Sequence, residues 1–295
     1  MNLRVTLSNI DYLRFFKDYN IEGVIVGLDR FSDRFNYYFT IDQLKEIIVL
    51  SKLNNLNVYV NLNVMIEEDE IDDLKHYLKE LYKLELTGIY FNDFALLNIA
   101  YDLGMAHKMI YSADTLITNS LDALFYLKQG IKSVVVAKEI TLNELIKMGQ
   151  RCDNLELIIH GRINLSYSKR MFLTNYMNYI NSDHLVKDNY HLTIKEETRD
   201  TRMPIIETKY GTSIYSDMSL CSFIEYDSLK ALFSVGIIDD IFMSKEELLD
   251  TLGAYFELNQ ANAIMIDKKF KDKYPRANYG SCFYYDKTTK TKGGE

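Results

Sequence analysis

Short apolar segments alternate with helical patterns along the first two thirds of the chain, and this alternation most constrains the fold. The segment Gly23–Gly27 (GVIVG) is entirely apolar, as expected for a strand buried on both faces. The predicted strands are Leu3–Leu7, Gly23–Gly27, Asn57–Leu62, Gly88–Phe91, Lys108–Tyr111, Ser133–Val136 and Leu157–His160. Repeated strand-then-helix units predict a parallel sheet covered by helices.

Helix signals fill the intervals between these strands. Thr40 is a candidate N-cap of a helix that continues through Leu53. Thr141, with Glu144 three residues later, has the spacing of a capping box and predicts a helix through about Gln150. Because so many strands precede residue 160, the sequence favours an α/β fold with a (β/α) barrel-like core. A doubly wound parallel sheet is the alternative.

The pattern changes in the last third of the chain. The pair Tyr210-Gly211 can form a turn between two short alternating segments, which predicts antiparallel pairing. The strands predicted in this part are His191–Glu196, Pro204–Lys209 and Thr212–Tyr215. We therefore predict a small β-rich insertion over residues 181–218.

A helix–strand–helix order returns after the insertion and can close the barrel. The segments are Ser219–Phe233, Ile237–Met243 and Lys245–Asn259. The barrel-like domain is accordingly predicted to comprise residues 1–180 and 219–260. Residues 261–295 are predicted to form a C-terminal segment with a polar tail.

Composition narrows the classes of function. The net charge of −8 works against broad nucleic-acid binding, because affinity for a polyanion depends on neutralised phosphates. Cys152, Cys221 and Cys282 lie far apart, which is typical of reduced thiols and not of a disulfide framework or a metal cluster. Neither a long apolar run nor a signal-peptide pattern is present, so we predict a cytoplasmic protein without membrane contact.

The stretch Leu155–Arg170 (LELIIHGRINLSYSKR) is the strongest local candidate for a site. Its apolar run ends at His160, and we expect a polar, basic loop to follow. His160 can act as a general base, bind an anion or be a hydrogen-bonded structural residue. Lys169 and Arg170 can bind carboxylate or phosphate, although a solvated charged loop explains them equally well.

Polar residues also stand at the ends of the other predicted strands. They are Asn61, Asn63, Asn92, Asp93, Ser112, Asp114, Lys138, Glu139 and His160. Carboxyl ends of parallel strands meet at one rim, where (β/α) proteins form their sites. The alternative is that each residue merely ends its strand or caps a helix, as Asp93 does before Phe94. Lys138 and Glu139 are adjacent, so only one of them enters the mouth if the strand continues through both.

Several standard catalytic motifs are absent from the sequence. There is no HExxH pattern, no GxSxG or cysteine-protease signature, no GxGxxG and no P-loop. Cys221 is better explained as a small buried apolar residue than as a nucleophile. The sequence therefore predicts no metal site and identifies no nucleophile.

Seven segments of the sequence form a recognisable set: VYVNLN (Val58–Asn63), YFND (Tyr90–Asp93), TN (Thr118-Asn119), VVVAKEITLNEL (Val134–Leu145), IIHGR with YSKR, KEETRDTRMPIIETKYGTSIYSDMSLC (Lys195–Cys221) and GSCFYYDKTT. Together they resemble the U32 peptidase family, a collagenase-like family of unassigned catalytic type. Their order and spacing match over roughly residues 20–220. The HG…YS motif and the AKE segment are the most specific of these.

The resemblance implies a (β/α) barrel-like core and two kinds of activity. Some members are labelled proteases, and others serve oxygen-independent hydroxylation of tRNA, ribosomal RNA or a quinone precursor. Short members resemble one half of a pair that makes 5-hydroxyuridine at the tRNA wobble position, with prephenate as an implied small-molecule ligand. The partners implied are a larger paralogue from the same family and tRNA.

The sequence departs from the family pattern at several positions. Hydroxylating members carry iron–sulfur cysteines where this chain has Asn164 and Met171, so no such cluster is expected here. A family glutamine is replaced by Asp114. The segment Asp239–Met243 (DDIFM) replaces a strand that carries lysine and arginine in the family. These differences favour a subunit that depends on a longer paralogue.

Three hypotheses follow from the sequence and the resemblance. The first is a component of tRNA uridine 5-hydroxylation, the second a collagenase-like peptidase and the third a non-catalytic scaffold. The predicted catalytic residues are His160, Glu139 and Asp93. The predicted ligand-binding residues are Asn61, Asn63, Lys138, Arg162, Ser168, Lys169 and Arg170.

Overall fold

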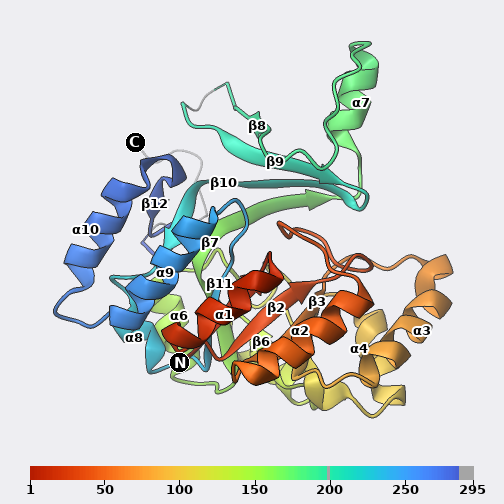
Figure 1. Cartoon of the computed structure of the whole chain (residues 1–295), viewed down its shortest axis with the longest axis horizontal. Coiled ribbons are helices and arrows are strands. Elements are labelled where there is room, and N and C mark those ends of the chain that lie inside the picture. Colours follow the sequence, from red (N-terminus) through yellow and green to blue (C-terminus); the bar gives the residue numbers. More distant parts are fainter. Residues whose placement is uncertain (198–199, 286–295) are drawn as a thin grey trace.

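Eight parallel strands close into a barrel in the computed structural model, which describes residues 1–197 and 200–285 (Figure 1). They are β1 (Asn2–Leu7), β2 (Gly23–Gly27), β3 (Asn57–Leu62), β4 (Gly88–Phe91), β5 (Met109–Tyr111), β6 (Ser133–Val135), β7 (Leu155–Ser168) and β11 (Val235–Ile238). β11 pairs with β1 on one side and with β7 on the other, so no edge of the parallel sheet stays open. The predicted barrel is confirmed, and the doubly wound sheet is wrong.

Helices cover the outside of this barrel. They are α1 (Leu13–Phe16), α2 (Ile41–Leu53), α3 (Ile71–Tyr82), α4 (Phe94–Asp102), α5 (Ser120–Leu127), α6 (Leu142–Gly149), α8 (Tyr226–Lys230), α9 (Lys245–Glu257) and α10 (Ala263–Lys273), with the 3₁₀ turns η1 (Ile10–Tyr12), η2 (Lys17–Tyr19), η3 (Glu68–Glu70), η4 (Ala106–Lys108) and η5 (Pro275–Ala277). Thr40 and Thr141 each form a reciprocal capping box, as predicted, which fixes where α2 and α6 begin. No helix among the described residues has both the length and the apolar character needed to cross a bilayer.

The floor of the barrel is a network of charged and hydroxyl groups. Arg4 of β1 donates to Glu156 of β7 at 2.8 Å and to the hydroxyl of Tyr90 at 2.7 Å. Arg4 also pairs with Glu22 at 2.7 Å, and its guanidinium lies 3.8 Å from the centre of the Tyr59 ring. Arg4 and Glu156 are only 4% and 1% exposed, so each depends on the other for compensation of its charge.

β7 does not stop at His160, contrary to the sequence prediction. It continues to Ser168, and the expected loop is a strand that pairs antiparallel with β10 (Gly211–Cys221). Gly161 permits the change of course, because its φ is +121° and a Cβ there would lie 2.3 Å from the carbonyl oxygen of Asp239. The segment HGRINLSYS is therefore a strand in a two-stranded ribbon with β10 and not a loop.

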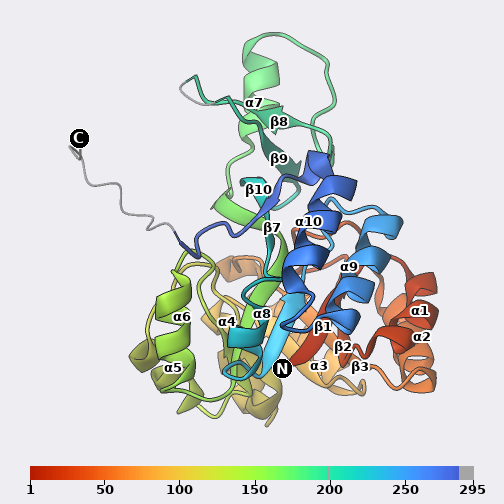
Figure 2. The same ribbon diagram turned by 90° about the vertical axis from the view of Figure 1, so that its left-hand side faces the viewer.

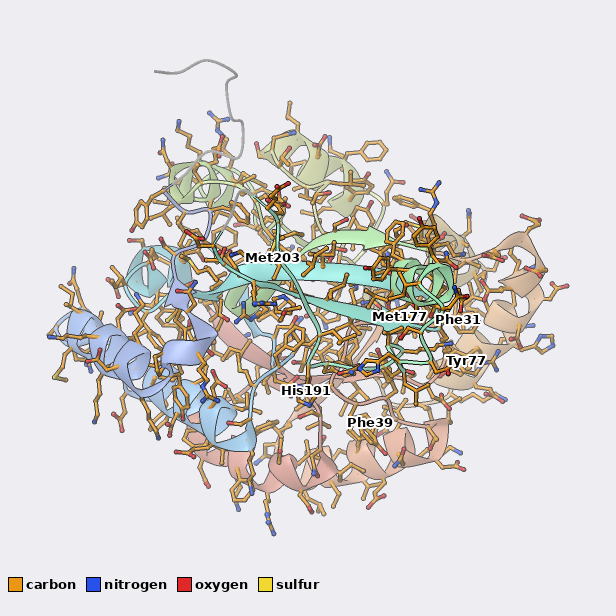
Figure 3. The ribbon with its side chains drawn as sticks, turned by 90° about the horizontal axis from the view of Figure 1, so that it is seen from above. Phe31, Phe39, Tyr77, Met177, His191 and Met203 are labelled. Atoms are coloured by element: carbon orange, nitrogen blue, oxygen red, sulfur yellow. The ribbon has the colours of Figure 1, made fainter. Side chains whose placement is uncertain are left out.

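The β7–β10 ribbon is extended by further short strands and carries a helix that projects from the barrel. β9 (Met203–Thr208) pairs with β10, β8 (Thr193–Ile194) with β9, and β12 (Tyr279–Gly280) with β10. Figure 2 shows this ribbon rising above the barrel together with α7 (Phe172–Tyr179). In the view from above, α7 is seen nearly end-on beside the ribbon, where Met177 marks it (Figure 3).

The β-rich segment differs from the sequence prediction mainly at its C-terminal border. The hairpin around Tyr210-Gly211 is confirmed. The predicted helix Ser219–Phe233 is wrong, because β10 continues to Cys221 and only Tyr226–Lys230 is helical. The proposed domain boundaries stay predictions. The part of the predicted polar tail at 286–295 lies outside the described residues.

Candidate functional site

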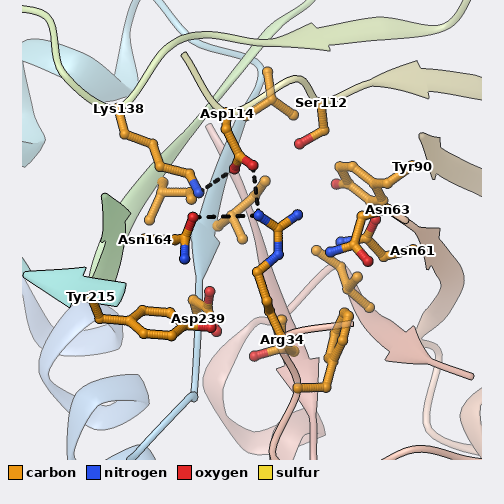
Figure 4. A pocket seen from close by; sticks show the side chains of 16 residues that line it. Arg34, Asn61, Asn63, Tyr90, Ser112, Asp114, Lys138, Asn164, Tyr215 and Asp239 are labelled. Atoms are coloured by element: carbon orange, nitrogen blue, oxygen red, sulfur yellow. Dashed lines mark hydrogen bonds and ion pairs between the residues drawn. The ribbon is translucent and has the colours of Figure 1, made fainter. Parts of the chain in front are cut away.

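A small polar cavity of about 70 Å³ lies at the carboxyl ends of the barrel strands (Figure 4). Its polar lining residues are Thr6, Arg34, Asn61, Asn63, Tyr90, Ser112, Asp114, Lys138, Asn164, Tyr215 and Asp239. They come from β1, β3, β4 and the segments that follow β2, β5, β6 and β11, together with the β7–β10 ribbon. This is the end at which (β/α) barrels place their sites.

Asp114 lies between two cations at the centre of this cavity. One of its carboxylate oxygens is 2.7 Å from Arg34 Nη1, and the other is 2.5 Å from Lys138 Nζ. Burial by itself would raise the pKa of Asp114, but the charges and hydrogen bonds of Arg34 and Lys138 outweigh it and hold the pKa well below its usual range. Asp114 is therefore ionised at neutral pH, and the three side chains together carry one net positive charge.

Both partners of the Arg34–Asp114 pair stand on strained backbone. The φ of Arg34 is +68° and that of Asp114 is +48°, in the left-handed region that residues with a side chain seldom occupy. Each such residue costs on the order of 1 kcal/mol, which the surrounding structure must offset. Arg34 lies in the loop between β2 and α2, and its neighbour Asp33 anchors this loop. The N–H of Asp33 donates to Asn63 Oδ1 at 2.8 Å, and its carboxylate accepts from the Thr208 hydroxyl at 2.9 Å. These contacts hold Arg34 in place for its ion pair with Asp114.

Several polar atoms around the cavity have no partner within the described residues. They are Asn61 Oδ1, Asn92 Oδ1 and the hydroxyl of Tyr215, all of them buried. Leaving such groups unpaired costs about 1–3 kcal/mol each, so a bound polar ligand or water molecules would satisfy them. Ser112 adds a hydroxyl that faces the cavity and makes no hydrogen bond to any described side chain. The site thus offers two cations, an anion and unpaired amide and hydroxyl groups to a small polar ligand.

Two acidic residues follow β11 at the same rim. Asp239 lines the cavity, and burial raises its pKa. Asp240 is 2% exposed and accepts a hydrogen bond from the Thr6 hydroxyl at 2.7 Å; burial raises its pKa to about 7. A carboxyl group with a pKa near neutrality can take up or release a proton under physiological conditions.

The structure brings some of the predicted site residues together. Asn61, Asn63 and Lys138 all line the cavity. Asp93 lies in an adjoining cavity, where it caps α4 through Ala95 N–H and also accepts from Ile66 N–H at 3.0 Å. Glu139 lines none of the described cavities near the mouth, so of the Lys138-Glu139 pair only the lysine enters the barrel.

The predicted basic residues of β7 are dispersed along the ribbon. Arg162 lines a different cavity, beside α9. Lys169 is paired with Glu67 at 2.6 Å, and the hydroxyl of Ser168 accepts from Arg170 N–H at 3.3 Å. Arg170 is exposed and has no ion-pair partner among the described residues. Ser168, Lys169 and Arg170 are therefore not among the residues that line the mouth cavity.

His160 is placed away from the cavity, on the outer face of β7. It is completely buried and is surrounded by the rings of Phe223, Tyr255, Phe270 and Tyr279, with centroid distances of 4.8–5.7 Å. Its ring nitrogens are 3.4 Å from the hydroxyls of Thr251 and Tyr255. Burial lowers the pKa of His160 to about 3, so the ring is neutral at physiological pH. This geometry supports the structural reading of His160 and gives the catalytic one no support.

Replacing His160 with alanine tests the structural role. We expect the free energy of unfolding to fall by about 2–4 kcal/mol at pH 7.5, because a cavity would remain among four rings. Since the folded-state pKa of His160 is depressed, its contribution is present above pH 6.5 and is lost as the pH falls toward 3. The difference between wild type and variant should therefore shrink between pH 6.5 and pH 4, as measured by urea unfolding. His107→Ala, at an exposed histidine, is the control; equal stability of the two variants would contradict the structural role.

Sequence reasoning did not select Arg34, Tyr215 or Asp239 as site residues, and it named Asp114 only as a strand-end residue and as the replacement of a family glutamine. The length of the connection from Leu28 to Thr40 could have pointed to Arg34, because long loops in compact domains tend to be functional. No sequence feature could have identified Tyr215, since its place in the site depends on the pairing of β10 with β7.

A comparison with known protein families shows to which family this chain belongs. The model of Peptidase family U32 matches residues 8–290. The chain belongs to the U32 peptidase family. Among curated relatives, tRNA hydroxylation protein P2 of Bacillus subtilis (strain 168) is 24% identical over 241 residues, which cover 79% of this chain and 77% of that protein. tRNA hydroxylation protein P1 of the same strain is 26% identical over 172 residues, or 58% of this chain but only 41% of P1.

A solved structure agrees with this U32 assignment at the level of the fold. The structure of a U32 peptidase superposes with a TM-score of 0.52 at 15% sequence identity, covering 81% of this chain and 92% of that one. The likeness extends over most of both chains and supports the shared barrel.

The two positions where hydroxylating U32 members carry cluster cysteines have separate surroundings here. Asn164 lines the mouth cavity, with its Oδ1 3.4 Å from Arg34 Nη1, whereas Met171 precedes α7. Within residues 1–197 and 200–285, no group of three or more His, Cys, Asp or Glu side chains is arranged to hold a metal ion. The residues at the mouth suit a polar organic ligand better than an iron–sulfur cluster.

Proposed function

We propose that this U32 protein is a component of tRNA uridine 5-hydroxylation and acts together with a longer family member. The observation that carries the proposal is its similarity to P2, which extends over 77% of that tRNA hydroxylation protein, against 41% of the longer P1. A short chain related along most of its length to P2 fits the role of the smaller component.

The polar mouth cavity supports a direct part in the reaction. Arg34 and Lys138 supply positive charge, and Asn61 and Asn63 supply amide groups that can donate and accept. We propose that these groups bind and orient a carboxylate group of a small anionic ligand, with prephenate as the candidate, whose remaining atoms would extend into the adjoining cavity of about 350 Å³ that shares Arg34, Asp114 and Asn164. Asp114 keeps the two cations in place, and Asp239, which also lines the cavity, is the candidate for proton exchange.

Nucleoside analysis of tRNA tests this proposal. The gene for this chain would be deleted in its native host, and total tRNA would be digested and measured by mass spectrometry. We expect 5-hydroxyuridine and nucleosides derived from it to be lost, and to return with the wild-type gene. Unchanged amounts in the deletion strain would overturn the proposal.

The partnership requires a separate test. Tagged protein purified from the same host should carry the longer U32 family member in a stoichiometric amount. If the chain is purified alone and restores hydroxylation in an extract lacking the longer protein, the partnership is wrong while the hydroxylation role stands.

The peptidase alternative has less support than hydroxylation. Among the described residues, no serine or cysteine side chain is hydrogen-bonded to a histidine ring, as an activated nucleophile would be. Burial raises the pKa of Cys152, Cys221 and Cys282, which works against thiolate formation. The scaffold alternative and the proposal differ in what they predict for substitutions in the mouth cavity. A non-catalytic scaffold would tolerate such substitutions without loss of hydroxylation.

A further inference from the structure

A second and larger cavity of about 680 Å³ lies beside the start of α9. It is lined by residues of the β7–β10 ribbon, the segment after β11 and the turn η5 that follows α10. Figure 2 shows α9 and α10 next to this ribbon. Its charged lining residues are Arg162, Glu247, Lys273 and Arg276. Three of these four side chains are cationic, although the whole chain is acidic.

Arg162 is held in this cavity without a counter-ion. Its Nη1 donates to the carbonyl oxygen of Ser216 at 2.6 Å and its Nη2 to that of Ala277 at 3.3 Å. Both acceptors are neutral, and no described carboxylate lies within 4.0 Å of the guanidinium. Burial lowers the pKa of Arg162, as expected for a cation that has lost water without gaining an ion pair. The two carbonyls fix the side chain and leave other N–H groups of its guanidinium free.

The remaining groups define what the cavity can accept. Arg276 is exposed and forms no ion pair with a described residue, whereas Lys273 is already paired with Glu246 at 2.9 Å and Asp250 at 2.5 Å. Glu247 accepts from the hydroxyl of Tyr279 at 2.9 Å, and its charge acts on Arg162 together with that of Asp217. Two cations without ion-pair partners suit an anion, and a carboxylate acceptor beside them suits a hydroxyl group on the same ligand.

This cavity and the barrel mouth lie next to each other along the same ribbon. Asn164 pairs with Tyr215 and both line the mouth, whereas Arg162 pairs with Ser219 and both line the second cavity. A bulge in β10 between Tyr215 and Ser219 separates the two pairs. The segment after β11 also contributes to both, through Asp239 to the mouth and through residues 241–243 to the second cavity. A ligand that extends along the ribbon can therefore reach both.

We propose that the second cavity binds a phosphate group of a ribonucleotide, with Arg162 and Arg276 on the phosphate oxygens and Glu247 on a ribose hydroxyl. Guanidinium groups bind phosphate through paired hydrogen bonds, for which the guanidinium of Arg276 and the remaining N–H groups of Arg162 are available. The assignment of this phosphate to RNA rests on the proposed function; the phosphate site itself does not.

Binding measurements on the purified chain test the site. The probes are a fluorescein-labelled single-stranded RNA of ten uridines, followed by fluorescence anisotropy, and inorganic phosphate, followed both as a competitor of the RNA and by direct calorimetric titration. We expect Arg162→Gln and Arg276→Gln each to weaken RNA binding about fivefold to twentyfold and to reduce the slope of log Kd against log salt by about one. Lys83→Gln, at an exposed lysine outside the cavity, should bind like wild type.

The outcomes separate the two proposals. RNA binding that both arginine variants weaken, with phosphate competing, supports the ribonucleotide site even if the tRNA nucleosides of the deletion strain are unchanged. Phosphate binding that the variants weaken, without RNA binding, retains a phosphate site but overturns its assignment to RNA. Equal binding by wild type and both variants overturns the site. Arg276→Gln keeps the test valid if Arg162→Gln unfolds the ribbon, because Arg276 is exposed.

Discussion

Replacing Arg4 with methionine is expected to lower the free energy of unfolding by about 3–5 kcal/mol, the range found when one partner of a buried ion pair is removed. The variant would leave Glu156, 1% exposed, with hydrogen bonds from Tyr90 and Ser133 but without a counter-ion. Glu22 would lose its pairing as well. Urea unfolding followed by circular dichroism at pH 7.5 measures the change.

An exposed ion pair provides the matched control for this prediction. Lys230 is paired with Asp227, and both are more than 40% exposed, so Lys230→Met should cost less than about 1 kcal/mol. If Arg4→Met lowers the stability no more than Lys230→Met does, the barrel floor does not depend on the charge of Arg4. The double variant Arg4→Met/Glu156→Leu should recover part of the loss, because it removes the uncompensated carboxylate together with the cation.

Replacing Asp114 with asparagine is expected to reduce tRNA 5-hydroxyuridine in a complemented deletion strain at least tenfold. The change removes the carboxylate that holds Arg34 and Lys138 at 2.7 and 2.5 Å, so two like charges would face each other in the mouth cavity. Nucleoside mass spectrometry measures the product, and immunoblotting shows whether the variant accumulates. Asp102→Asn, an exposed aspartate on α4, is the control and should complement fully.

The same substitution has a stability signature with a defined sign. The pKa of Asp114 is depressed in the folded protein, so its contribution is present above the ordinary carboxyl pKa near 4 and is lost as the pH falls below it. Asp114→Asn should therefore be less stable than wild type by about 1–3 kcal/mol at pH 7, with the difference shrinking below pH 4. Full hydroxylation in a stable Asp114→Asn strain would favour the scaffold alternative.

The strands and helices of this protein follow from local patterns in its sequence. GVIVG forms β2 with the predicted bounds, and the capping residues Thr40 and Thr141 mark the starts of α2 and α6. Such signals depend on residues a few positions apart, so each segment carries its own information. The polar strand ends Asn61, Asn63 and Lys138 were predictable for the same reason, because parallel strands in a barrel bring their carboxyl ends to one rim.

The tertiary structure alone decided which of these polar groups meet. β7 continues past His160 because it pairs with β10, which lies more than forty residues later in the chain. The helices packed on the outer face of β7 surround His160 with aromatic rings. Arg34 and Asp114 are separated by 80 positions, and Arg4 and Glu156 by 152, so no local pattern links them. Barrel closure brings these groups together, and burial then sets their charge states. Local periodicity thus determined the barrel elements, whereas the mouth cavity and the charged floor required the closed fold.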